Sequence, residues 1–178
     1  LSGMGLPFEA QQLAKITRIV PMKSCHKLNI VWQLPSQVKA YRGKVMEYIS
    51  HICGHEGAGS LLSGLKKYGL ASGLSFGLDD DSLGNNSIFS LVMIKITLTR
   101  SGLANWMFVV RLVYDYIGML RSQGPQKRIF DELVAVENIK YQFQEGCEED
   151  DLVDDLATNM LDTWAVDRAH LLNKWAVN

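Results

Sequence analysis

The stretch at residues 87–98, "SIFSLVMIKITL", is the strongest strand signal in this chain of 178 residues. Apolar side chains recur at every second position, which is the period of a strand with one buried face. The residues that share this face are Ile88, Ser90, Val92, Ile94, Ile96 and Leu98. A strand this apolar needs partner strands and a covering layer, and the neighbouring sequence offers both.

Three other segments are candidate strands. Residues 70–78, "LASGLSFGL", precede a turn at 79–86, "DDDSLGNN", whose Asp, Asn and Gly residues favour a reversal of the chain. We therefore expect an antiparallel hairpin between 70–78 and 87–98. Residues 14–21 and 27–34 are further expected strands, the second with Leu28, Ile30, Trp32 and Leu34 on one face.

Helices are expected at 36–52 and at 61–68, the latter closed by Gly69. A longer helix is expected from a cap at Thr99 or Ser101 to Ser122. Its predicted buried stripe is Leu103, Trp106, Val110, Val113, Tyr114, Ile117 and Leu120.

Two more helices are expected towards the C-terminus. One begins with Pro125 at its first position and has a core face of Ile129, Leu133, Val136 and Phe143. The other follows an acidic run at 145–155 and extends to about residue 175. This order of elements predicts one α+β domain over residues 1–178, an antiparallel sheet with helices packed on one face.

Composition limits the functional classes. Hydrophobic residues make up 47% and charged residues 21%, and no apolar run reaches the length of a membrane helix. Residues 1–70 carry a net charge of +6 and residues 71–178 carry −7, without the aromatic platform typical of nucleic-acid binding. The cysteines, Cys25, Cys53 and Cys147, suit a reducing compartment, which favours the cytoplasm.

Residues 51–59, "HICGHEGAG", raise the question of a metal site. His51 and His55 are four residues apart and would share a helix face, but zinc requires at least a third ligand. H-E-x-x-H fails because Gly59 stands where the second histidine belongs, and H-x-x-E-H fails at Gly54. The simpler interpretation is a helix end with polar residues, and we predict no metal in this chain.

Other chemistries fit this segment less well. The phosphate-loop patterns are missing, and Glu56 would repel a phosphate. Cys53 lies two residues from each histidine, but its apolar neighbours favour a buried thiol, so no catalytic residue is predicted. A peptide-binding role remains open, because Glu56 could hold an amine and the Gly-containing strand could pair with a peptide backbone.

Three segments together resemble the second domain of insulinase-family zinc metallopeptidases, and their sequences are insulysin- or nardilysin-like. They are "SHICGHEGAGSLLSGLKKYGLASGLSFG", "NNSIFSLVMIKITLTRSGL" and "YIGMLRSQGPQKRIFDEL", and the resemblance covers about residues 7–175. It implies a non-catalytic domain that lines a chamber, in a longer chain whose H-x-x-E-H zinc site lies in another domain. This chain is then a segment that ends before the last helix and strand of its domain.

The resemblance also implies which residues hold substrate. Gly54 and Glu56 follow the first long helix, and Leu74, Ser75, Phe76 and Gly77 form the strand that would pair with a peptide. Glu56 would face the amine at the N-terminal end of the peptide. Relatives often have consecutive glycines in this strand, whereas Leu78 follows Gly77 here, so the register of the strand is less securely carried over.

The expected function is therefore peptide-substrate binding within a zinc metallopeptidase, with the other domains of the same chain as partners and with neither nucleic acid nor a membrane as partner. This chain alone is expected to be inactive and free of cofactors, the zinc belonging to the catalytic domain. The alternative is a catalytically inactive family member that acts as a scaffold or as a peptide- or partner-binding subunit.

Overall fold

A computed structural model describes residues 6–37, 40, 43–78, 84–143, 150, 153–154 and 157. Contacts divide the chain into two units. One unit comprises Leu1–Gln37 and Val45–Gly124, and the other comprises Val38–Lys44 and Pro125–Asn178. The first unit contains the sheet and helices α1 to α4, and the second contains α5.

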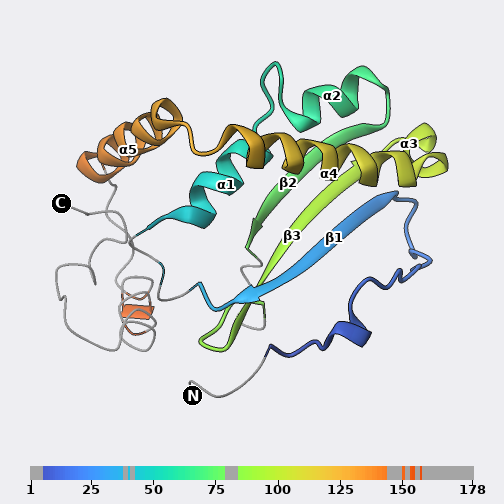
Figure 1. Cartoon of the computed structure of the whole chain (residues 1–178), viewed down its shortest axis with the longest axis horizontal. Helices are drawn as coiled ribbons and strands as arrows, with labels where there is room; N and C mark the ends of the chain where they lie inside the picture. Colours follow the sequence, from blue (N-terminus) through green and yellow to red (C-terminus); the bar gives the residue numbers. More distant parts are fainter. Residues whose placement is uncertain are drawn as a thin grey trace. The chain divides into compact units, whose positions relative to one another are not determined.

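The sheet has three strands in the order β1-β3-β2, and both pairings are antiparallel (Figure 1). The strands are β1 (Lys27–Pro35), β2 (Ala71–Leu78) and β3 (Phe89–Leu98). The expected hairpin of residues 70–78 with 87–98 is confirmed, as is the strand at 27–34. The most apolar strand is thus the central one, paired along both of its edges.

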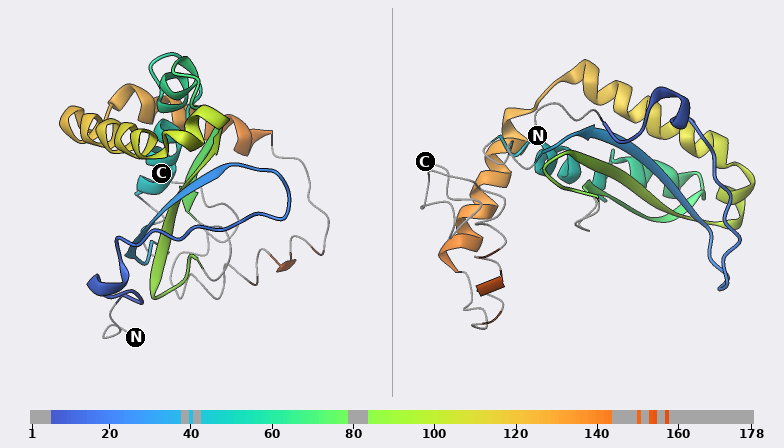
Figure 2. Two further views of the ribbon diagram at one scale, coloured as in Figure 1. Left: turned by 90° about the vertical axis from the view of Figure 1, so that its right-hand side faces the viewer. Right: turned by 90° about the horizontal axis from the view of Figure 1, so that it is seen from below.

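One face of this sheet forms the hydrophobic core. Ile94, Ile96 and Leu98 of β3 are almost completely buried, because α2 (Leu61–Lys67) and α4 (Trp106–Gln123) pack over them. Figure 2 shows these two helices on the same side of the sheet. Lys95 and Thr97, which alternate with the core residues of β3, are exposed on the opposite face. The predicted α+β class, with helices on one face of an antiparallel sheet, is confirmed.

Capping residues and glycines determine where α2 begins and ends. The Ser60 side chain accepts a hydrogen bond of 3.1 Å from the amide of Ser63 and so caps the helix. Gly59 and Gly69, on either side, have φ angles of +84° and +64°, which side chains with a Cβ disfavour. The predicted short helix closed by Gly69 is therefore confirmed.

The strand expected at residues 14–21 is wrong. This segment forms no strand, and Ile16, Ile19 and Val20 are largely exposed. Its alternating pattern finds no neighbouring strand, and alternation alone does not create pairing partners. The preceding segment contacts β1 instead, where the Gln33 side chain exchanges hydrogen bonds of 3.1 and 2.6 Å with the Phe8 backbone.

The helix expected at 36–52 starts later, because α1 spans Val45–Gly54. The residues after β1 are held by the β3 side of the sheet. Ser36 donates a hydrogen bond of 2.6 Å to the Asn86 carbonyl, and the Gln37 amide donates one of 2.9 Å to the Ser90 hydroxyl. Ser90 is fully buried and thus serves as a tertiary anchor, which local sequence patterns do not report.

The single helix expected from 99 to 122 is two helices, α3 (Arg100–Ala104) and α4, separated by Asn105. The cap at Thr99 is confirmed, since its hydroxyl accepts a hydrogen bond of 3.0 Å from Gly102. The predicted stripe is confirmed in part, since Val113 is fully buried and Trp106 and Ile117 pack against the core. Leu103 and Tyr114 of the stripe are exposed, and Val109, which the stripe did not include, is fully buried.

Helix α5 (Lys127–Gln142) begins after Gln126 as its N-cap, so Pro125 lies before the helix and not at its first position. None of its residues is buried; Ile129 and Leu133 are half-buried, but Val136 and Phe143 of the predicted core face are exposed. The acidic run and the last expected helix lie mostly outside the described residues. No helix in the described part of the chain is long and apolar enough to cross a membrane.

The start of β2 and the start of α3 are joined at a close backbone contact. The Thr99 amide and hydroxyl donate hydrogen bonds of 3.0 Å to the Leu70 carbonyl and 2.7 Å to the Gly69 carbonyl. Gly102 packs directly beside this point, and a Cβ added there would lie 1.9 Å from the Leu70 oxygen. The fold therefore requires glycine at position 102, because the Leu70 backbone occupies the space that a side chain would need.

Gly102→Ala should destabilise the fold by about 1–3 kcal/mol or more, because the clash is with backbone that cannot move without breaking the Thr99 bonds. Gly118→Ala is the matched control, since Gly118 lies within α4 with open space around its Cβ position. That control should raise stability by about 0.5–1 kcal/mol. Urea unfolding measures both, and equal midpoints for Gly102→Ala and the parent chain would contradict the contact.

Cys53 in α1 is 2% exposed, and burial raises the pKa of its thiol to about 11. We expect it to react much more slowly with iodoacetamide at pH 8 than the exposed Cys25, because the thiolate is the nucleophile. Peptide-resolved mass spectrometry after timed labelling measures both rates. Equal labelling rates in the folded chain would contradict the burial of Cys53.

The raised pKa of Cys53 also makes stability depend on pH. Above pH 9 the Cys53 thiol loses its proton more readily in the unfolded chain than in the folded one, so its contribution to stability is lost as the pH rises towards 11.

Candidate functional site

A groove of about 400 Å³ lies between α1 and the end of β2. One wall is the N-terminal half of α1, with Met46, Glu47 and Ser50. The other wall and the floor come from the sheet and consist of Ser75, Phe76, Gly77, Leu78, Met93 and Lys95. The groove therefore combines apolar side chains, two hydroxyls and two charges of opposite sign.

The strand that borders this groove is at the edge of the sheet. β2 pairs with β3, and within the described residues it pairs with no other strand. A strand with one unpaired edge presents backbone N–H and C=O groups to any extended chain that approaches it. The groove therefore lies beside backbone that is able to pair with a peptide.

Small residues keep the groove open beside β2. A Cβ added at Gly77 would meet the Ser50 hydroxyl oxygen at 3.8 Å, an ordinary van der Waals distance. Helix α1 and β2 thus come together through Gly77 and Ser50. A larger side chain at 77 would occupy the groove without striking the backbone of the helix.

The residues singled out from the sequence fall into two groups. Ser75, Phe76 and Gly77 line the groove, while Leu74 packs against the hydrophobic core. Gly54 and Glu56 do not line it; Gly54 ends α1, and Glu56 belongs to the loop that leads to α2. The loop carries the Glu56 carboxylate 3.6 Å from the Lys66 ammonium, and both side chains are well exposed.

Sequence reasoning missed several groove residues, of which Glu47, Ser50 and Lys95 are polar. One signal was present: Lys95 interrupts the most apolar strand of the chain, at a position that faces away from the core. Glu47 and Ser50 are three residues apart and so share a face of α1. Nothing in the local pattern indicates that this face meets β2.

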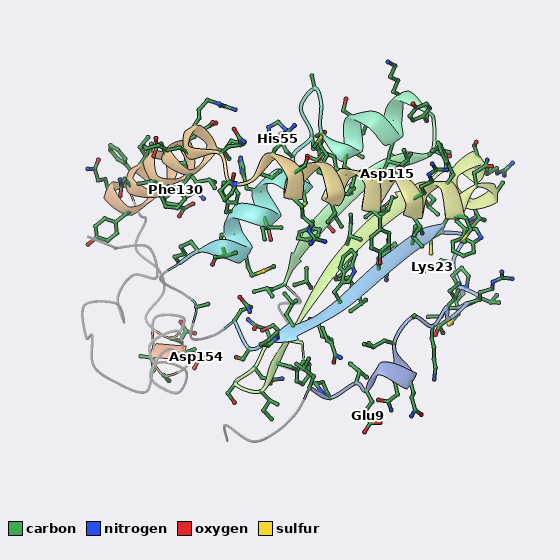
Figure 3. All side chains as sticks on the ribbon, in the orientation of Figure 1. Glu9, Lys23, His55, Asp115, Phe130 and Asp154 are labelled. Atoms are coloured by element: carbon green, nitrogen blue, oxygen red, sulfur yellow. The ribbon has the colours of Figure 1, made fainter. Side chains whose placement is uncertain are left out.

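The two histidines of residues 51–59 lie near the end of α1 and in the loop after it, where Figure 3 labels His55. The rings of His51 and His55 are 5.9 Å apart, and the Nδ1 atom of His55 accepts a hydrogen bond of 2.8 Å from the Gly57 amide. Among the described residues, no group of three or more His, Cys, Asp or Glu side chains is placed to hold a metal ion.

Comparison with known proteins gives a consistent assignment. The family model described as "Peptidase M16 inactive domain" matches residues 4–136. The chain is 38% identical to rat nardilysin over 86% of its own length and 13% of the relative's length. It is 36% identical to the A-factor-processing enzyme of Saccharomyces cerevisiae, with 84% of this chain and 14% of the relative covered.

Structural similarity agrees with this. A crystal structure of pitrilysin superposes with a TM-score of 0.76 at 29% sequence identity, covering 87% of this chain and 16% of that one. The chain therefore spans less than one fifth of the length of these relatives. By family model, sequence and fold, the chain belongs to the M16 peptidase family, and the part of the family that it matches is the inactive domain.

Proposed function

We propose that this chain is the substrate-binding, non-catalytic domain of an insulinase-like zinc metallopeptidase. It binds an extended peptide along β2, while another domain of the same protein holds the zinc and hydrolyses the peptide. The partners of this chain are then the peptide and the other domains. The single observation that supports the proposal is that the outer edge of β2, which no strand of the described residues pairs with, lies beside an open groove.

Strand addition suits this edge for two reasons. First, a peptide that pairs with β2 satisfies backbone groups that β3 leaves unpaired. Second, Ser75 and Gly77 have small side chains, so a second backbone can approach closely without a clash. Main-chain hydrogen bonds supply affinity that does not depend on sequence, which fits a domain that holds many peptides in turn.

Glu56 is the proposed anchor for the free amine at the N-terminus of the peptide. Its carboxylate is exposed, and its present contact with Lys66 is long at 3.6 Å. An exposed pair of this kind contributes little to stability, so exchanging Lys66 for a peptide amine has a small cost. The loop carries Glu56 beyond the C-terminal end of α1, whereas the groove lies beside the N-terminal half of that helix.

Filling the groove at β2 should prevent peptide binding. Gly77→Val is expected to weaken binding of a fluorescent peptide at least tenfold, because its side chain occupies the space beside Ser50. Gly73→Val is the matched control on the same strand, since Gly73 has only the Thr97 side chain nearby and does not line the groove. Fluorescence anisotropy measures both affinities, and circular dichroism checks the fold.

A peptide that is N-methylated on alternate backbone nitrogens should also bind more weakly than the parent peptide, because it has lost donors for strand pairing. Strand addition at β2 would be excluded if the parent chain bound both peptides equally and if Gly77→Val bound the unmethylated peptide as tightly as the parent chain does.

Glu56→Ala should weaken binding of a peptide with a free N-terminal amine by about two- to fivefold, as expected for an exposed ion pair. Binding of the acetylated peptide should not change. Glu9→Ala, which removes an exposed carboxylate distant in sequence, serves as the control. The same loss for free and acetylated peptides would show that Glu56 does not recognise the amine.

A further inference from the structure

Two charges in the groove have no counter-ion of their own. Glu47 and Lys95 both line it and are exposed, and neither forms an ion pair within the part of the chain that the structure describes. Other surface charges do pair: Arg111 lies 3.7 Å from Asp115, and Lys127 lies 2.6 Å from Asp131. Carboxylate and ammonium groups that share a groove without meeting are both available to a ligand.

Strand register places Lys95, and the position of α1 places Glu47, beside different residues of β2. Lys95 is the cross-strand partner of Ser75, whereas Met93 is the partner of Gly77. Ser50 stands opposite Gly77, and Glu47 is its neighbour on the same face of α1. Lys95 therefore belongs to the Ser75 row, and Glu47 belongs to the wall beside Gly77.

A peptide on the edge of β2 would extend both rows. Side chains alternate along a strand, so the peptide residues beside Ser75 and Gly77 are two positions apart and point to the same face. One of these side chains meets Lys95, and the other meets the wall that carries Glu47. Met46 and Met93 are apolar and do not distinguish charged peptides from one another. The groove residues that do so are Glu47 and Lys95.

We propose that the groove selects extended peptides that carry opposite charges on residues i and i+2, with the acidic side chain at Lys95 and the basic one at Glu47. This inference rests on the proposed strand addition and adds a substrate class to it. Like charges at the two positions place one side chain against its own sign. Neutral peptides bind through the backbone alone and gain nothing from either group.

Glu47 also has a structural role to be separated from recognition. It lies in the first turn of α1, where a carboxylate interacts favourably with the helix dipole. That role predicts lower stability for any Glu47 variant, whatever the peptide. Recognition instead predicts that the order of preference among peptides changes, which a stability effect cannot produce.

The test uses four acetylated peptides that differ only at two positions: Lys-x-Glu, Glu-x-Lys, Lys-x-Lys and Glu-x-Glu. Acetylation removes any contribution of Glu56. At low salt we expect one of the two mixed-charge peptides to bind best, by about two- to fivefold for each favourable charge. The preference should shrink at high salt, because both groups are exposed.

Charge reversal makes the test specific. The double variant Glu47→Lys with Lys95→Glu should prefer the mixed-charge peptide of the opposite order, and each single variant should lose the original preference. Asp115→Lys and Lys23→Glu are matched controls that make the same charge changes at exposed positions outside the groove (Figure 3). The controls should keep the preference of the parent chain.

The outcomes separate the two proposals. Equal affinity for all four peptides, or an unchanged preference in the double variant, overturns charge selection. If Gly77→Val still weakens binding at least tenfold in that case, strand addition itself stands. If no peptide binds the parent chain, both proposals are overturned.

Discussion

The pairing of β3 along both of its edges is the constraint on which the rest of this structure depends. Because β1 and β2 occupy the two sides of β3, each of them has one outer edge. Burial of Ile94 and Ile96 under α2 and α4 then assigns the helices to one face and leaves Lys95 on the other. The groove lies where α1 meets β2, and Met93 and Lys95 of β3 complete its lining.

Much of this arrangement could be predicted from the sequence. The alternation in residues 87–98 and the glycines around 61–69 correctly indicated the central strand, its hairpin partner and α2. These signals are local and strong, because they combine period, turn chemistry and capping in a few residues. The family assignment was also accessible, since its motifs are distributed over most of the chain.

The failures share a physical cause. Residues 14–21 have a strand pattern but no partner strand among the described residues. Ser36 and Gln37 stand at the start of a helical pattern but contact Asn86 and Ser90. In both cases tertiary contacts, or their absence, decide the conformation. The groove is similar: Ser75 and Gly77 were found through a family motif, whereas Glu47 and Lys95 come together only through strand register and the position of α1.

The register of β3 has a consequence for the order in which the chain assembles. The end of the hairpin, Leu78 with Val92, joins residues only 14 apart in sequence, whereas Lys27 and Thr97 are 70 apart. Loop-closure entropy rises with separation, so β2 and β3 should pair before β1 joins them. Until β1 joins, β3 and β2 form an apolar two-stranded hairpin, and β3 has an unpaired edge on its β1 side. The edge that the finished protein buries is thus the one most exposed to misassembly while it folds.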